Sequence, residues 1–167
     1  MRDHINLFES QEQEIHKFME QNGIQKYEIT PEGVDVHQDV WLSNSGLLEL
    51  PFQFNIVHGN FSGSNNELES LRGAARVVHG NFGCSYNYLE SLEFCPKFIK
   101  KEFYCSGNKI SPWEHRYLLF SEIQGGINTN NKKLDWFFIK YKNQKALIPE
   151  ALKELRLLQI KWEQENA

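Results

Sequence analysis

Three histidines recur at intervals of 21 residues, at His37, His58 and His79, and these side chains could bind a metal ion. A zinc site needs three or four convergent ligands with hydrogen-bonded support, whereas these imidazoles would stand in a row on neighbouring strands. A cysteine near His79 could act as a nucleophile, but the alternation of the chain places Cys84 and Cys105 inward, where a thiol behaves as a small apolar group. The sequence has no Gly-rich phosphate loop and no paired-carboxylate motif. We therefore expect neither an enzyme nor a metal or cofactor site.

The residues that we expect to contact a partner are aromatic and basic. They are Trp41, Tyr86, Tyr104, Lys97, Lys100, Lys101 and Lys109. Exposed aromatic side chains on rigid strands make efficient contacts, and lysines attract acidic proteins or a phosphate backbone. No recognised nucleic-acid motif accompanies them. The alternative for Trp41 and Tyr104 is that they pack beneath the terminal helices.

Composition indicates one compact body of 167 residues, of which 40% are hydrophobic. No apolar run approaches the ~20 residues of a membrane helix, and the N-terminus lacks the apolar stretch of a secretory signal. Three cysteines are an odd number, so we expect free thiols in a reducing, cytoplasmic compartment. The net charge of −4 combines −9 for residues 1–96, +7 for residues 97–161 and −2 for the last six residues. This split predicts either two charged faces with different partners or ordinary solvated surface.

A 21-residue repeat determines the predicted architecture. Position by position, the columns read Val40, Phe61, Phe82, Phe103; Leu42, Gly63, Cys84, Cys105; Ser45, Asn66, Asn87, Asn108; and Leu47, Leu68, Leu89, Ile110. Period-two alternation within each copy predicts a strand with one buried side. Self-similarity at this period indicates a solenoid, so we expect four stacked parallel strands near residues 36–42, 57–63, 78–84 and 99–105. The asparagines should form a buried ladder that satisfies backbone groups at a tight turn.

This pattern resembles the leucine-rich repeat, whose core is L-x-L-x-x-N-x-L. The segment Phe103-x-Cys105-x-x-Asn108-x-Ile110 matches that core position for position, and the four copies together cover residues 36 to about 113. The chain is also similar to F-x-C-S-x-N-x-L-x-S-L repeats of phage and bacterial proteins. Gly63 and Ser45 depart from the pattern. The resemblance implies an α/β repeat fold, a short leucine-rich-repeat-like solenoid with a role in binding.

The ends of the solenoid should be covered by helices. We expect an N-terminal capping helix within residues 1–30, a solenoid over 31–113 and a helical C-terminal cap over 114–167. Ile5, Phe8, Ile15, Phe18 and Met19 form the apolar stripe of the first helix, which ends at Asn22-Gly23. Ser111-Pro112-Trp113-Glu114 predicts a capping box that opens a helix to about Ile123. Residues 133–141 are helical or contain a strand at 136–139, and Pro149 opens the last helix, with Leu152, Leu155, Leu158 and Trp162 on one face.

We expect a non-enzymatic module that binds a protein or ribonucleoprotein. The likeness to phage repeats implies, in its sharpest form, an inhibitor of a bacterial defence system such as an RNA-guided nuclease. The alternative is an RNA-binding protein that uses the basic C-terminal half. The sequence does not specify the oligomeric state.

Overall fold

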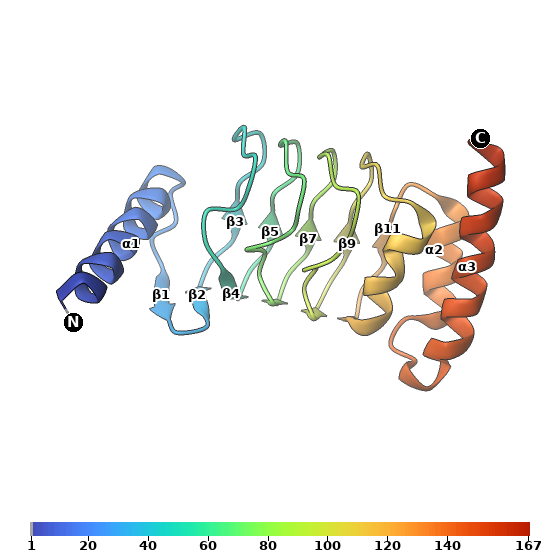
Figure 1. Ribbon diagram of the computed structural model, residues 1–167. Coiled ribbons are helices and arrows are strands. Elements are labelled where there is room, and N and C mark those ends of the chain that lie inside the picture. The colour runs from blue at the N-terminus through green and yellow to red at the C-terminus, as the bar shows by residue number, and fades with distance from the viewer. Residues whose placement is uncertain (1) are drawn as a thin grey trace.

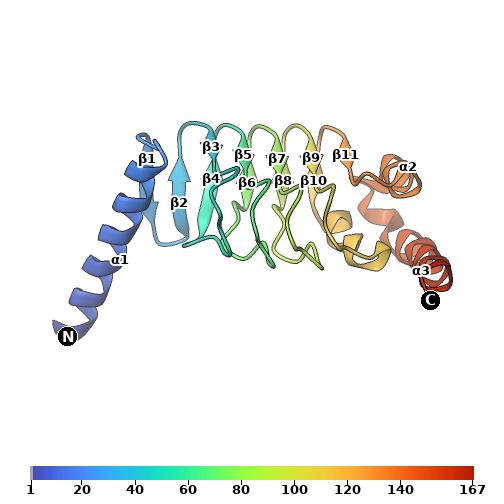
Figure 2. The same ribbon diagram turned by 90° about the horizontal axis from the view of Figure 1, so that it is seen from above.

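The computed structural model describes residues 2–167, with side chains from residue 9 onward, and the chain forms a solenoid with helices at both ends (Figure 1). Sheet A contains, in spatial order, β1 (Tyr27–Thr30), β2 (Gly33–Val36), β4 (Phe54–Val57), β6 (Val77–Val78), β8 (Phe98–Ile99) and β10 (Glu122–Ile123). Sheet B contains β11 (Ile127–Asn128), β9 (Phe103–Tyr104), β7 (Phe82–Gly83), β5 (Phe61–Ser62) and β3 (Val40–Trp41). Figure 2 shows the two rows of strands along the solenoid. Apart from the antiparallel β1–β2 hairpin, the described strand pairs are parallel.

The predicted parallel solenoid is confirmed, but the expected number of four strands is wrong. Each predicted strand spans a bend between two strands: the predicted strand at residues 57–63, for example, begins at the last residue of β4 and contains β5. Five coils contribute to the two sheets. At the bends after β4 and β6, a glycine meets the preceding coil. A Cβ on Gly59 would lie 2.8 Å from the backbone nitrogen of Asp39, and one on Gly80 would lie 2.6 Å from the carbonyl oxygen of Gly59. Only a residue without a side chain fits such a close approach.

The fifth coil was not predicted because its spacing differs. Glu122 pairs with Phe98 and Ile127 with Phe103, so the offset is 24 residues (122 less 98). The additional residues lie in η1 (Pro112–Phe120), a 3₁₀ helix that replaces the usual return loop. Strands β10 and β11 therefore continue both sheets beyond residue 113.

The repeat columns build the core as the alternation predicts. Val40, Phe61, Phe82 and Phe103 are buried, and the phenyl rings stack with centroid distances of 5.3 Å (Phe61 to Phe82) and 5.6 Å (Phe82 to Phe103). Offset stacking of this kind adds to the free energy gained by burying the rings.

The asparagine ladder is also present. Asn66 Nδ2 donates to the carbonyl oxygens of Leu42 (2.8 Å) and Gly63 (3.1 Å), and Asn66 Oδ1 accepts the N–H groups of Ser45 and Leu47. Asn87 and Asn108 repeat this arrangement one and two coils later. The amides satisfy backbone groups at the turn that the parallel ladder leaves unpaired.

At the N-terminal end, α1 (Arg2–Gln21) covers the core as expected. Met19 is buried, Ile15 and Phe18 are partly buried, and Gly23 follows the helix with a φ of 67°. The side chains of Ile5 and Phe8, also assigned to this apolar stripe, lie outside the described residues. Within the described chain, none of the helices combines the length and apolar character that a membrane-crossing segment requires.

The C-terminal helices follow the predictions in part. The capping box is wrong: the Ser111 side chain makes no cap hydrogen bond, and the Glu114 carboxylate instead accepts the Ser91 hydroxyl at 2.8 Å. The element is a 3₁₀ helix that ends at Phe120, because the chain must then enter β10. Residues 132–141 form a helix, α2 (Lys132–Tyr141), rather than a strand. After η2 (Lys145–Leu147), α3 (Ile148–Glu165) buries Leu155 but leaves Trp162 partly exposed.

Candidate binding groove on sheet B

The outward face of sheet B carries a groove between two aromatic side chains. The strand registers align Trp41, Ser62, Gly83 and Tyr104 in one row across β3, β5, β7 and β9. Three strand steps of ~4.8 Å place Trp41 and Tyr104 about 14 Å apart. Trp41 is 59% exposed and Tyr104 is 37% exposed, so neither side chain is covered by a terminal helix. The alternative, that Trp41 and Tyr104 pack beneath the terminal helices, is therefore wrong.

The floor of the groove is flat because Gly83 has no side chain. The heavy atoms nearest to a Cβ at position 83 would be the hydroxyl oxygens of Ser64 (3.1 Å) and Ser62 (3.4 Å) and the Cβ of Ser62 (3.9 Å), so the Ser64 hydroxyl would have to move by a few tenths of an ångström. No backbone atom lies close, and the residue has no positive φ, so the fold itself does not demand glycine here. Its absence of a side chain keeps open a hollow of about 340 Å³.

Tyr86 forms a third aromatic contact at the edge of this groove. It occupies a left-handed turn position with a φ of 55° and is largely exposed. A side chain on Gly107, in the next coil, would collide with the Tyr86 ring, so this glycine allows the ring to lie over its backbone. Tyr86, Trp41 and Tyr104 thus line the same hollow.

A second row of polar side chains holds the corner beside the groove. The Asp39 carboxylate accepts the N–H of Asn60 at 2.7 Å, and Asn60 Oδ1 accepts the N–H of Asn81 at 2.9 Å. Asn81 Oδ1 accepts the N–H of Glu102 at 3.0 Å. This row keeps the four coils in register and so fixes the positions of the aromatic side chains that follow it in each coil.

The described residues that line the groove carry no formal charge. They are Trp41, Asn60, Phe61, Ser62, Ser64, Asn65, Asn81, Gly83, Ser85, Tyr86 and Tyr104. Aromatic faces with neighbouring hydroxyl and amide groups can bind a neutral segment through stacking and hydrogen bonds.

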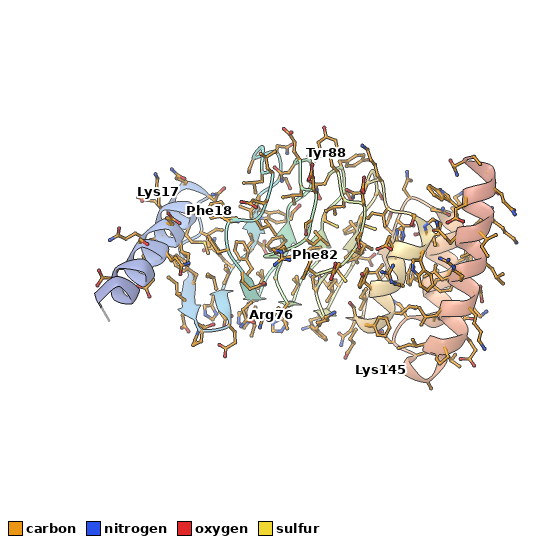
Figure 3. The ribbon with its side chains drawn as sticks, viewed as in Figure 1. Lys17, Phe18, Arg76, Phe82, Tyr88 and Lys145 are labelled. Carbon is orange, nitrogen blue, oxygen red and sulfur yellow. The ribbon has the colours of Figure 1, made fainter. Side chains whose placement is uncertain are left out.

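The four predicted lysines do not form one patch. The N–H of Lys97 donates to the carbonyl oxygen of Arg76 at 2.8 Å, whereas Lys109 Nζ lies 5.6 Å from the centroid of the Tyr88 ring. Figure 3 shows Arg76 and Tyr88 on opposite edges of the solenoid. Lys100 and Lys101 are exposed and follow β8, at the corner between the sheets. The structure therefore separates Lys109 from the other three lysines.

The three repeated histidines and the two cysteines of the repeat pack against neighbouring side chains of the solenoid. The imidazoles of His37 and His58 stack at 4.7 Å between centroids, and His58 and His79 meet edge to face at 5.0 Å. Among the described residues, no group of three or more His, Cys, Asp or Glu side chains has a geometry that could hold a metal ion. Cys84 and Cys105 are buried free thiols, and burial raises the pKa of both above the ordinary value.

Sequence reasoning identified the aromatic members of the groove but missed its floor. Gly83 follows Phe82 in the repeat, at the position where the other copies have Trp41, Ser62 and Tyr104, all of which carry side chains. A glycine in an outward strand position, with no turn to explain it, was the available signal.

Comparison with known proteins gave no match among family models, curated proteins or solved structures.

Proposed function

We propose that this protein is a non-enzymatic binding module, built as a leucine-rich-repeat-like solenoid, which engages a macromolecular partner through the sheet B groove. The observation that carries the proposal is the uncovered pair Trp41 and Tyr104 on either side of the flat floor at Gly83. Such side chains lose little conformational entropy on binding because the strands already hold them in place. The absence of charge in the described lining favours a neutral, partly aromatic segment of a protein.

A binding experiment with matched variants tests this proposal. The tagged chain is used to capture partners from the lysate of its native host cell, and each captured partner is then titrated against purified variants. Trp41→Ala and Tyr104→Ala should each weaken binding at every salt concentration, because the lost contacts are not ionic. Tyr88→Ala is the control, since Tyr88 is also exposed but lies outside the groove. Equal binding by all three variants would refute the assignment of the site.

A second candidate, RNA binding, is favoured by one observation. Lys100 and Lys101 are exposed in the same coil as Tyr104, so bases stacked on the groove aromatics would leave phosphates within the attraction of these lysines. Charge reversal at Lys100 and Lys101 should then weaken binding chiefly at low salt, where screening is small. Co-purified material that absorbs at 260 nm, together with a steep loss of binding in salt, would favour RNA over a protein partner.

The narrower role of a phage inhibitor of an RNA-guided nuclease rests on the repeat resemblance alone. It predicts that such a nuclease, or its ribonucleoprotein complex, is among the captured partners. Inhibition of the purified nuclease, lost in Trp41→Ala, would be the corresponding activity.

A further inference from the structure

The outer faces of α2 and α3 carry large apolar side chains that nothing covers. Trp136 is 71% exposed and Leu157 is 60% exposed, and Ile139 and Ile160, one turn further along the two helices, are also exposed. Residues three apart share one face of a helix, so each pair forms an apolar stripe. Isolated exposed apolar residues are common, but a contiguous group of this size usually marks an interaction surface.

The two stripes lie beside the same seam. Lys140 Nζ on α2 is 2.8 Å from Glu154 on α3, and Lys133 Nζ is 4.0 Å from Glu165, so the helices run antiparallel. Trp136 lies one helical turn from Lys133 and one from Lys140, and Leu157 lies one turn from Glu154. Helical spacing therefore places Trp136 and Leu157 on one surface, which we call the tail surface: Trp136, Ile139, Leu157 and Ile160, with Lys132, Lys133, Lys153 and Lys161 around it and the carboxylates of Glu154 and Glu165 at its seam.

The opposite end of the molecule has the complementary character. A groove of about 680 Å³ lies between α1, the β1–β2 hairpin and the return loop at residues 52–53, and its apolar lining includes Ile15, Ile29 and Phe52. Glu12 and Glu32 lie at this groove, and Arg76 is the single basic side chain among its described lining residues. A neighbouring hollow of about 360 Å³ shares Ile15 and Phe52 and adds Glu14. We call these hollows together the head groove.

The charges of the two surfaces match their positions in the chain. The head groove belongs to the segment 1–96 with net charge −9, and the tail surface belongs to the segment 97–161 with net charge +7. Figure 1 shows α1 and α3 at opposite ends of the solenoid. One molecule therefore cannot place its own tail surface in its own head groove.

We infer that the chain associates head to tail, with the tail surface of one copy docked in the head groove of the next. Apolar side chains would be buried on both sides, and lysines would face glutamates around the contact. A contact between two different surfaces leaves one of each free, so it produces chains of increasing length rather than a closed dimer. This inference is independent of the proposed partner groove, because sheet B takes no part in it.

Analytical ultracentrifugation of the full chain tests the inference. The wild-type protein should show a weight-average mass that rises with concentration above the 19.6 kDa of one chain, and less so at high salt. The tail variant Leu157→Glu with Ile160→Glu and the head variant Glu12→Lys with Glu32→Lys should each weaken self-association about tenfold or more, because each brings like charges together. The substituted positions are exposed or partly exposed, and circular dichroism with a thermal melt checks that the variants fold. Leu48→Glu is the control: Leu48 is 67% exposed and outside both surfaces.

A mixture of the two variants gives the decisive result. The head variant keeps its tail surface and the tail variant keeps its head groove, so an equimolar mixture should associate to at least a dimer although neither variant does so alone. A wild-type protein that stays monomeric at all concentrations would overturn the inference. So would a head variant that still self-associates like wild type, since the contact would then join two tails. Binding of monomeric protein to anionic lipid vesicles, lost in the tail variant, would assign the tail surface to a membrane instead.

Discussion

Asn87→Ala is the most direct test of the asparagine ladder. Asn87 is buried, and its side chain joins its own coil to the preceding one. Its Nδ2 donates to the carbonyl oxygens of Gly63 (3.0 Å) and Cys84 (3.0 Å), and its Oδ1 accepts the N–H of Leu68 at 3.1 Å. Alanine removes these three hydrogen bonds together with a longer one from Nδ2 to the Ser85 carbonyl oxygen (3.3 Å).

The three backbone groups are not affected equally. The Gly63 and Cys84 carbonyl oxygens keep a second donor, because the Nδ2 groups of Asn66 (3.1 Å) and Asn108 (3.0 Å) also reach them. The Leu68 N–H has no second acceptor among its hydrogen bonds and becomes a buried, unpaired donor. A buried donor without a partner lowers the free energy of unfolding by ~1–3 kcal/mol. The loss of one of two donors at each of the two carbonyl oxygens lowers it by a further ~1 kcal/mol. The free energy of unfolding should therefore fall by about 3 kcal/mol.

Urea denaturation followed by circular dichroism measures this change. For a chain of this length, about 3 kcal/mol corresponds to a melting temperature lower by roughly 6–12 °C. Asn166→Ala is the control, because Asn166 is exposed after α3 and should change stability by less than ~0.5 kcal/mol. If Asn87→Ala and Asn166→Ala unfold at the same urea concentration, the ladder does not stabilise the solenoid and the reasoning is wrong.

Three further predictions concern the thiols, a buried histidine and the groove floor. Burial raises the pKa of the Cys84 and Cys105 thiols, so mass spectrometry should find both unmodified after iodoacetamide treatment of the folded protein at neutral pH; the double serine variant should lose stability but keep partner binding. Burial lowers the pKa of His115 from 6.5 to about 4, although His115 Nδ1 contacts the Ser111 carbonyl oxygen. The unfolded chain thus binds more protons between pH 6.5 and pH 4, so about 3 kcal/mol of stability should disappear as the pH falls through this window, and urea midpoints of His115→Gln should lack this dependence. Gly83→Leu should keep the fold once the Ser64 hydroxyl has shifted, as a thermal melt would check, but lose partner binding in a titration, because the side chain would fill the groove; unchanged binding would exclude the floor from the site.

Much of the fold could be predicted from periodicity. The columns of Phe61 and Asn87 were assigned correctly because a residue that recurs every 21 positions must serve the same purpose in each coil. The bend between the sheets was missed because Gly59 fits an inward strand position as well as a corner, and only contact with the preceding coil distinguishes the two. The fifth coil was missed because η1 lengthens its spacing to 24 residues, so it falls out of the 21-residue period.

The candidate site was predictable only as a set of residue types. Trp41 and Tyr104 were expected on the outer face, and they are exposed there. Lys109 was grouped with Lys100 because both are basic and close in the sequence, yet Asn108 and its turn lie between them and Lys109 reaches the opposite edge of the solenoid.

The sequence by itself determined the length of a coil and which side chains of each coil face inward, because alternation along a strand is a local property of the backbone. Stacking at a constant interval then follows, since identical coils bury their apolar columns best in register. The tertiary structure alone decided which outward side chains become neighbours. That outcome depends on the angle of the corner at Gly59 and Gly80, on the missing side chain at Gly83, and on how η1 turns the chain into α2 and α3. Each of these is a contact between coils or elements, and such contacts exist only once the solenoid has formed.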